Sequence, residues 1–405
     1  LGGEEANLLL PLYLVLAAGI VASAWRQWQA PAVSDENDRA TPSGIAGWPR
    51  PLLAISVVLF ALGLFWSDDR STGLQNLCFF LVPFALVFAL MLDVKWTRER
   101  LRTVLIVVVV MALVCALIGF AEFHWRHLLW NETVIRTNDF NVYFRVNSLF
   151  WDPNVYGRYL SLAITVVAAT LIWSRNRREM LILCAVAAVL WLALITTFSQ
   201  SSFIALLAGL AVLVALRWSL RWVLLGTGAL VIGAIVFATV AGDVVKLDLS
   251  RINAQSAGRA NLIEGGIDLF QNRPIFGYGS GAFSEAFRDE IAGQNAPVTE
   301  SHTEPVTVAA ELGVVGLAIY FALIASAIAA LGAGMRRVMP GLGAAFGTND
   351  PKRGPPAARA AVLAAFIAVL VHTITYAGFL DDPVTWVLIA IGYSLAFPCR
   401  ATSAA

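Results

Sequence analysis

The stretch VLIVVVVMALVCALIGF, from Val104 to Phe120, decides the fold class of this chain. It contains no charged residue. As an α-helix rising about 1.5 Å per residue, it is long enough to cross most of a hydrocarbon layer about 30 Å thick. A strand facing a water-filled lumen would alternate apolar and polar residues, so the pattern argues against a membrane β-barrel. We interpret this stretch as a membrane-spanning helix.

The composition agrees with that interpretation. Of the 405 residues, 59% are hydrophobic and 14% are charged, whereas soluble domains have about 45–50% apolar and about 25% charged residues. The excess is too large for a buried core, because a soluble protein still needs a charged surface. The net charge of +1 comes without a basic arm or an aromatic and basic platform, so nucleic-acid binding is excluded.

Apolar runs of this kind recur along the chain. They predict an all-α, polytopic transmembrane helical bundle of about 11–12 spans with a large helical extracytoplasmic loop. The span at 304–334 exceeds one membrane thickness, so we expect it to tilt or to project from the membrane. The candidate spans are 8–24, 51–66, 73–92, 103–120, 155–173, 180–197, 201–216, 221–240, 304–334, 358–379 and 384–398.

The short loops fix the orientation, because positively charged loops stay in the cytoplasm. Four basic clusters fall on one side if these spans hold, and that side is predicted to be cytoplasmic. An odd number of spans puts Leu1 outside, and we expect a further helix upstream of it. The clusters are Lys95, Arg98, Arg100 and Arg102; Arg175, Arg177 and Arg178; Arg217 and Arg221; and Arg336, Arg337, Lys352, Arg353 and Arg359.

The domain organisation follows from the same spans. Residues 1–240 form an N-terminal transmembrane bundle that includes an outer loop at 121–153. Residues 241–303 form a large periplasmic or extracytoplasmic loop, and 304–405 hold the C-terminal transmembrane helices. A structureless loop of some sixty residues is improbable, so this large loop should carry helices of its own. Its segment 260–270 fits an amphipathic helix with Leu262, Ile263, Ile267 and Phe270 on one side.

Polar residues concentrate on the outer side of the predicted membrane, where their placement is informative because they are costly within a bilayer. Several lie within one turn of a span boundary, which predicts a polar cavity that opens outward. The residues are Arg145, Asp152, Asn154, Arg158, Gln200, Arg251, Arg259, His302, Glu304, Glu311, Asp381 and Asp382.

The segment from Arg145 to Asn154 allows two interpretations. Asp152 fits a helix cap followed by Pro153 at the first helical position, which needs no function. Arg145 fits a bidentate phosphate ligand, although an interfacial arginine would also be unremarkable.

Two further segments of the outer side carry candidate chemistry. Gly258-Arg259 opens the amphipathic helix and could bind an anion at a helix N-terminus, although exposed arginines are usually solvated. His302 lies where the chain re-enters the membrane. It could act as a base, although a lone histidine is more often structural. His372, on a late helix, more readily satisfies a partner inside the bundle. The glycine run Gly277–Gly281 lacks the preceding strand of a nucleotide-binding loop, and no metal-ligand spacing occurs.

Three pieces of sequence, taken in order, resemble the O-antigen ligase and polymerase superfamily of bacterial membrane glycosyltransferases. The first is Arg145 with Asp152-Pro153-Asn154. The second runs from Gly258-Arg259 through Arg273-Pro274-Ile275-Phe276-Gly277-Tyr278-Gly279-Ser280-Gly281-Ala282-Phe283. The third is Ser301-His302-Thr303 with Glu311-Leu312-Gly313-Val314-Val315-Gly316-Leu317. The resemblance covers about 145–317 by motif.

The resemblance implies a GT-C-type fold in the bacterial cytoplasmic (inner) membrane, with an active site that faces the periplasm or exterior. It implies an undecaprenyl-pyrophosphate-linked glycan donor, a glycan or lipid-glycan acceptor, surrounding membrane lipids, and neither cofactor nor metal. A ligase would pass the glycan to an acceptor such as a lipid A core sugar, and a polymerase to another carrier-linked repeat.

The resemblance also implies roles for particular residues. His302 takes the place of the base, and Arg145 and Arg259 the places of pyrophosphate-binding arginines. We add as substrate-binding candidates Gln200, Arg158, Asp152, Asn154, Tyr278 and Glu304.

One departure from the family pattern affects the third phosphate-binding position. Ligases commonly have Ser-Arg-Gly or Ser-Arg-Ser at the outer start of a middle helix, where this chain has Ser199-Gln200-Ser201-Ser202. Gln200 can donate a hydrogen bond to phosphate but brings no charge, and Arg158 or Arg251 could compensate. Two other classes stay open. A lipid-linked oligosaccharide transporter should show internal repeats and midspan charges, and a scaffold would need no polar outer cluster.

Overall fold

The computed structural model describes residues 5–29, 42, 44–140, 143–218, 221, 225, 259–293, 301–335, 356–376 and 378–398. Every regular element in these ranges is helical, which confirms the predicted all-α class. The elements are α1 (Glu5–Gln29), η2 (Gly44–Gly47), α2 (Pro49–Gly63), α3 (Arg70–Asn76), η3 (Leu77–Leu81), α4 (Val82–Leu92), α5 (Arg98–Trp125), α6 (Glu132–Phe140), α7 (Pro153–Trp173), α8 (Arg177–Thr197), α9 (Gln200–Arg217), α12 (Arg259–Asn272), α13 (Phe283–Phe287), η5 (Arg288–Ala292), α14 (Glu304–Gly332), α15 (Pro356–Thr375) and α16 (Pro383–Ala396).

Helices stand at ten of the eleven predicted spans. Seven are long and apolar enough to cross a membrane: the continuous segment Arg70–Leu92, and α5, α7, α8, α9, α14 and α15. Three shorter apolar helices, Leu10–Arg26, Pro49–Gly63 and Pro383–Ala396, occupy the other three positions. Of the predicted span 221–240, only residues 221 and 225 are among the described residues, so this span stays a prediction. The chain is therefore an integral membrane protein built as a polytopic helical bundle.

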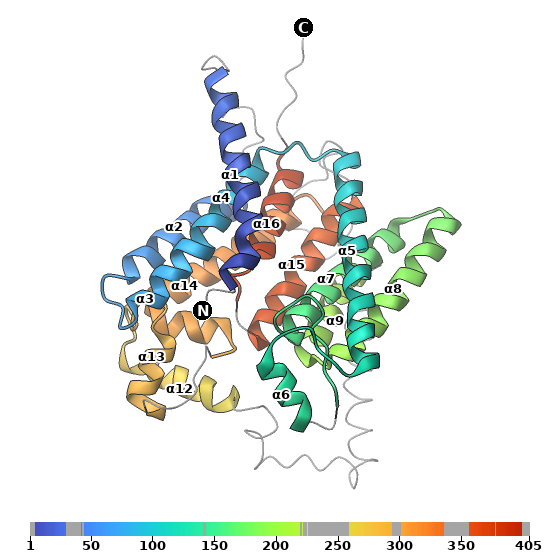
Figure 1. Ribbon diagram of the computed structural model, residues 1–405. Coiled ribbons are helices and arrows are strands. Elements are labelled where there is room, and N and C mark those ends of the chain that lie inside the picture. Colours follow the sequence, from blue (N-terminus) through green and yellow to red (C-terminus); the bar gives the residue numbers. More distant parts are fainter. Residues whose placement is uncertain are drawn as a thin grey trace.

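The helices run back and forth between two ends of the molecule (Figure 1). The basic turns that open α5 and α8 lie at one end, and the outer-loop helices α6, α12 and α13 lie at the other. This is the separation that the loop charges predicted. We call the end with α6, α12 and α13 the outer end.

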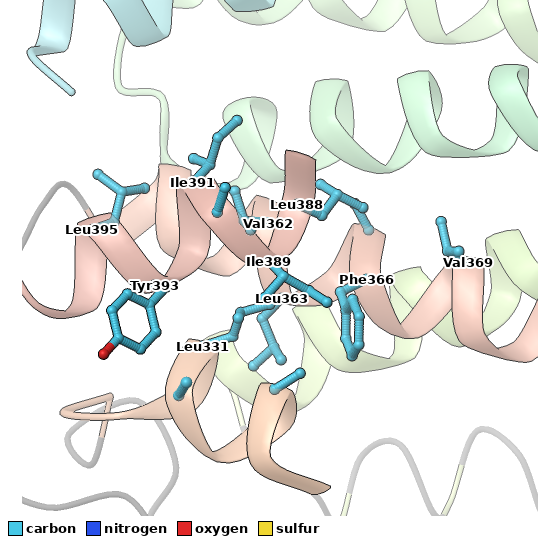
Figure 2. Packing of buried hydrophobic residues seen from close by; sticks show 14 of the residues in the cluster. Leu331, Val362, Leu363, Phe366, Val369, Leu388, Ile389, Ile391, Tyr393 and Leu395 are labelled. Carbon is cyan, nitrogen blue, oxygen red and sulfur yellow. The ribbon is translucent and has the colours of Figure 1, made fainter. Parts of the chain in front are cut away.

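Helices α7 and α15 form the centre of the bundle. In the most apolar stretch of each helix, 61% of the residues of α7 and 67% of those of α15 are buried. The corresponding shares are 22% for α5 and 28% for α8. Since all four are strongly apolar, this difference separates central helices from helices that present leucine and valine to lipid. Figure 2 shows how α14, α15 and α16 contribute to the core, with Leu331, Phe366 and Ile389 in one cluster.

A break divides α14 into two parts. Gly313 has φ +62°, so the helix is interrupted after its first nine residues. The predicted long span therefore does not need to cross the membrane as one straight rod. Only glycine adopts this conformation without steric cost.

Residues 274–282, which connect α12 to α13 and are called the glycine loop below, pack against the break. Val314 N–H donates to the carbonyl of Pro274 (2.8 Å), while Tyr278 N–H and Gly279 N–H donate to the carbonyls of Ala310 (3.0 Å) and Glu311 (2.8 Å). These carbonyls have no partner within an interrupted helix, so the loop satisfies groups that would otherwise be costly to bury. The Glu311 side chain also accepts from Phe283 N–H (3.2 Å).

The large loop carries helices of its own, as predicted. Its helix α12 begins at Arg259, but the face that it buries differs from the expected one. Leu269 is fully buried and Gly265 and Gly266 are buried beside it, whereas Ile267 is 43% exposed. The prediction for Ile267 was wrong because two adjacent glycines let Phe287 and Val306 approach the helix closely, which shifts the buried face.

Candidate functional site

The N-termini of α7, α9, α14 and α16 lie at the outer end, together with the C-terminus of α15. Each helix N-terminus presents unpaired N–H groups and a partial positive charge. Several candidate residues from distant parts of the sequence meet where four such ends come together, among them Arg145, Arg158 and Glu304.

Arg145 lies in the extended segment before α7 and is held by two hydrogen bonds from its guanidinium. Its Nε–H donates to the Thr197 carbonyl at the end of α8 (2.9 Å), and one terminal nitrogen donates to Asn154 Oδ1 (2.9 Å). The Asn138 side chain of α6 also pairs with both backbone groups of Arg145. The fork geometry therefore fixes Arg145 against the end of α8 and the start of α7, and its role as a phosphate ligand stays a prediction.

Asn154 links Arg145 to a second group of residues, because its side-chain oxygen accepts hydrogen bonds from both Arg145 and Ser199. We call this group the serine–histidine cluster; it consists of Ser199, Ser201, Ser202 and His372. Ser199 Oγ donates to Asn154 Oδ1 (2.9 Å) and lies 2.8 Å from Ser202 Oγ. The Ser201 and Ser202 hydroxyls each lie 3.3 Å from His372 Nε2. All four residues are buried, and His372 is completely buried, which confirms that its partners lie inside the bundle.

A second arginine of the site, Arg158, lies one helical turn after Asn154 in α7. Arg158 is 7% exposed and forms an ion pair with Asp382, the N-cap residue of α16 (3.1 Å). Its other terminal nitrogen has no hydrogen-bond partner among the described residues. Arg158 also interacts electrostatically with Glu304. Burying an arginine at this depth is costly unless it is paired, and here the pairing is partial.

Glu304 is the first residue of α14, and its carboxylate is buried against the turn that follows α15. Its Oε2 accepts from Gly378 N–H (2.8 Å), and the N–H groups of Phe379 and Leu380 also hydrogen-bond to the carboxylate. The carboxylate thereby ties the start of α14 to the segment that carries Asp382. This contact brings His302, two residues before Glu304, close to the same region.

His302 is half-buried and is joined to the serine–histidine cluster by ring contacts through Tyr376. Its ring lies 5.6 Å from the Tyr376 ring, which in turn lies 5.7 Å from the His372 ring. Tyr376 follows His372 by four residues at the end of α15, so both point along one helix face. A continuous row of contacts thus runs from Arg145 through Asn154, the serines, His372 and Tyr376 to His302.

The remaining predicted residues are placed as follows. Asp152 caps α7 by accepting from Asn154 N–H (2.6 Å), as the structural interpretation held. Gln200 is exposed, while the serines on either side of it are buried. Arg259 opens α12 as predicted, but its side chain lies outside the described residues, so its convergence with Arg145 stays a prediction.

Tyr278 is buried in the glycine loop, with the Arg273 guanidinium 4.1 Å from its ring centre. Burial, together with the neighbouring Glu290, raises the pKa of Tyr278 to about 12. The hydroxyl therefore stays protonated at neutral pH. Its predicted contact with a substrate stays a prediction.

Sequence reasoning missed two residues that shape this site. Tyr376 carried one usable signal, its spacing of four residues from His372. Glu122, at the outer end of α5, is 3% exposed and accepts from Ser148 N–H (2.8 Å) and Leu129 N–H (3.2 Å). It anchors the segment that carries Arg145. A carboxylate at the end of a long apolar helix was the available signal.

The same superfamily emerges from comparison with known proteins. The sequence model of the O-antigen ligase family matches residues 185–321, which is about a third of the chain. The matched segment contains the second half of α8, all of α9, α12 and α13, and the first two thirds of α14, and so holds the serines, the glycine loop, His302 and Glu304. No curated protein matches the chain.

Fold and match together describe an integral membrane protein whose residues 185–321, the O-antigen ligase segment below, are similar to the O-antigen ligase family.

Proposed function

We propose that this protein is an O-antigen ligase-type glycosyltransferase. It would move a glycan from an undecaprenyl-pyrophosphate carrier to an acceptor hydroxyl on the outer face of the bacterial cytoplasmic membrane. The observation that carries the proposal is the row of contacts from Arg145 to His302 at the outer helix ends, half of it inside the O-antigen ligase segment.

The proposed donor site uses the positive end of this row. Breaking the bond between a sugar and a pyrophosphate leaves negative charge on the leaving group, and arginine stabilises that charge without titrating. Arg145 and Arg259 would bind the pyrophosphate, and the N-termini of α7 and α9 add partial positive charge beside it. Arg158 supplies a further guanidinium nitrogen that is not hydrogen-bonded.

The proposed acceptor step needs a base. His302 would accept the proton of the acceptor hydroxyl as that oxygen attacks the anomeric carbon, and the carrier pyrophosphate would leave with the bonding electrons. The His302 side chain is half-buried, and its ring packs against the Tyr376 ring, which restricts the orientation of the imidazole.

A polymerase of the same superfamily would use the same groups with another carrier-linked repeat as acceptor. The exposed Gln200, in the place where ligases commonly carry arginine, is compatible with either member. A transporter or flippase of lipid-linked oligosaccharide is the alternative from another class.

The decisive experiment is turnover by the purified chain in lipid vesicles. A radiolabelled undecaprenyl-pyrophosphate oligosaccharide is supplied with rough lipopolysaccharide as acceptor, and the products are separated by gel electrophoresis. Label on the lipopolysaccharide supports a ligase, and a ladder of longer carrier-linked chains supports a polymerase. Label that changes leaflet without a new covalent product would support the transporter and contradict the enzyme.

A further inference from the structure

A groove lies along α14 on the side that faces α2. Its polar lining comes from Asn76, Glu304, Thr307, Glu311, Tyr320 and Asp381. Apolar residues complete its wall, among them Leu59 of α2 and Ile319 of α14. Glu304, Thr307 and Glu311 follow one another at intervals of three and four residues, so they line one face of the outer half of α14.

Glu304 belongs both to the groove and to the region that contains the arginines. Its carboxylate accepts a hydrogen bond from Gly378 N–H and interacts with Arg158, and the same residue lines the groove. The two arginines of the site, Arg145 and Arg158, are absent from the groove lining. The described part of the site therefore has a basic region and an acidic groove that share one wall.

Tyr320 gives a second, independent indication that the groove binds a ligand. Its side chain is 4% exposed, and its hydroxyl makes no hydrogen bond within the described part of the chain. Thr373 lies near it, but the single hydroxyl proton of Thr373 goes to the Leu370 carbonyl, so Thr373 does not donate to the Tyr320 oxygen. A buried hydroxyl without a partner costs about 1–3 kcal/mol, so natural structures rarely keep one without a use.

We propose that this groove binds the sugar end of the acceptor, through its hydroxyl groups. Carboxylate oxygens accept hydrogen bonds, so a ligand that contacts Glu304 and Asp381 must offer donors to them. A carrier-linked pyrophosphate has only acceptor oxygens at neutral pH, which leaves the groove to the other substrate. Asn76 and Tyr320 can each donate or accept, and sugar hydroxyls match both kinds of group.

The position of the groove fits that ligand. His302 precedes Glu304 by two residues, so an acceptor held along α14 would place a hydroxyl near the predicted base. The two substrates would then be kept apart by the hydrogen bonds that each can donate and brought together at the start of α14. This inference rests on the proposed function for the reaction, but not for the binding of a sugar.

The test uses Tyr320→Phe, which removes one buried oxygen and nothing else. In the vesicle assay we expect the KM for rough lipopolysaccharide to rise about three- to tenfold, since one hydrogen bond contributes about 0.5–1.5 kcal/mol. The KM for the lipid-linked donor should stay unchanged. Stability should stay the same or rise, because the unpartnered hydroxyl stabilises nothing in the free protein. Asn76→Ala, on another wall, should act in the same direction.

Ser326→Ala is the matched control. Ser326 lies six residues after Tyr320 in α14 and is absent from the groove lining, and its buried hydroxyl donates to the Leu323 carbonyl (2.9 Å). It should leave both KM values unchanged. An unchanged acceptor KM in Tyr320→Phe would overturn the groove assignment while leaving the transferase function intact.

A binding measurement separates the two failures. The core oligosaccharide released from rough lipopolysaccharide is mixed with detergent-solubilised protein, and saturation-transfer NMR reports contact. We expect a signal with the wild type and a weaker one with Tyr320→Phe. If the protein transfers no glycan yet shows this difference, the proposed reaction fails and the groove stands. Equal signals from both proteins would contradict the proposal that the groove binds the acceptor sugar.

Discussion

The backbone of His302 has φ 58°, a left-handed conformation that non-glycine residues rarely adopt. Such a conformation costs about 1–2 kcal/mol and persists only where its surroundings enforce it. Here Ser301 Oγ accepts from Thr303 N–H (3.1 Å) on one side of His302, and Tyr376 packs against its ring. The residue for which we predict catalysis is therefore one of the strained positions of the chain, together with Ser148 and Phe198 near the same site.

This geometry sharpens the test of His302 as the base. His302→Ala should lower turnover about 10²–10⁴-fold, the usual effect of losing a general base, while donor binding persists. Because alanine is strained at this φ, His302→Asn provides a second variant, since asparagine tolerates the left-handed region. Both should lose transfer, measured as product formed per minute.

Recovery of activity in His302→Asn would mean that the backbone and not the imidazole matters. More than about a third of wild-type turnover in His302→Ala would also exclude the base role, since it lies far outside the general-base range. His124→Ala replaces an exposed histidine at the outer end of α5 and should change nothing.

For Arg145 we predict a loss of donor binding and not of base catalysis. Arg145→Lys keeps the charge, but one ammonium group cannot reach both the Thr197 carbonyl and Asn154 as the guanidinium does. We expect kcat/KM for the lipid-linked donor to fall about 10–100-fold, as for the loss of a charge-assisted hydrogen bond worth about 1.5–3 kcal/mol. Arg136→Lys is the control, because Arg136 is an exposed arginine of α6 paired only with Glu132. Equal donor kinetics in the two variants would remove Arg145 from the donor site.

At this scale the sequence could predict which residues are polar and outer, but only some of their contacts. Asp152 as a cap and His372 as a buried, partnered histidine follow from local pattern and were confirmed. The contact between the His302 and Tyr376 rings was not predictable, because it joins two segments about seventy residues apart. Such a contact depends on how α14 and α15 pack, which no local spacing encodes.

Among the elements, α14 shows how a motif acquires its physical meaning. The Glu-Leu-Gly sequence at 311–313 looked like a feature of one helix, but it is the junction between the broken helix and the glycine loop. A Cβ at Gly313 would lie 2.2 Å from the Ile275 carbonyl oxygen. The break and the loop therefore depend on each other, and sequence alone shows two glycine-rich segments without showing that they meet.

Gly313→Ala should consequently destabilise the protein more than glycine's conformational preference explains. Gly293→Ala is the matched control, because Gly293 also has positive φ (+86°) but no atom within 4 Å of an added Cβ. The control should cost about 1–2 kcal/mol, the strain of a left-handed alanine. Gly313→Ala adds a steric overlap with backbone and should lower the unfolding temperature clearly further, measured in detergent by a thermal shift. Similar losses in the two variants would show that the contact with Ile275 is not tight.

For the whole molecule, the apolar runs were the most reliable guide. Ten predicted spans are helices, because a run of about twenty apolar residues has few alternatives in a bilayer. The order of burial was not predictable: α5 is more hydrophobic than α7 but lies at the periphery. Hydropathy reports preference for lipid over water, whereas central position depends on small and polar residues that let helices approach. Gly157 and Gly209 are examples, each too close to a serine or threonine side chain to carry a Cβ.

The orientation of the molecule yields the last prediction. The basic turns at the start of α5 and α8 lie opposite α12 and α13, and loops rich in lysine and arginine remain in the cytoplasm. In a chain freed of its native cysteines, Gln271→Cys in α12 and Glu99→Cys in α5 each introduce one exposed thiol. In intact cells a membrane-impermeant maleimide should label only the Gln271→Cys protein, and after permeabilisation it should label both. Labelling of Glu99→Cys in intact cells would invert the topology, and would place the row from Arg145 to His302 on the cytoplasmic side, where the proposed reaction could not occur.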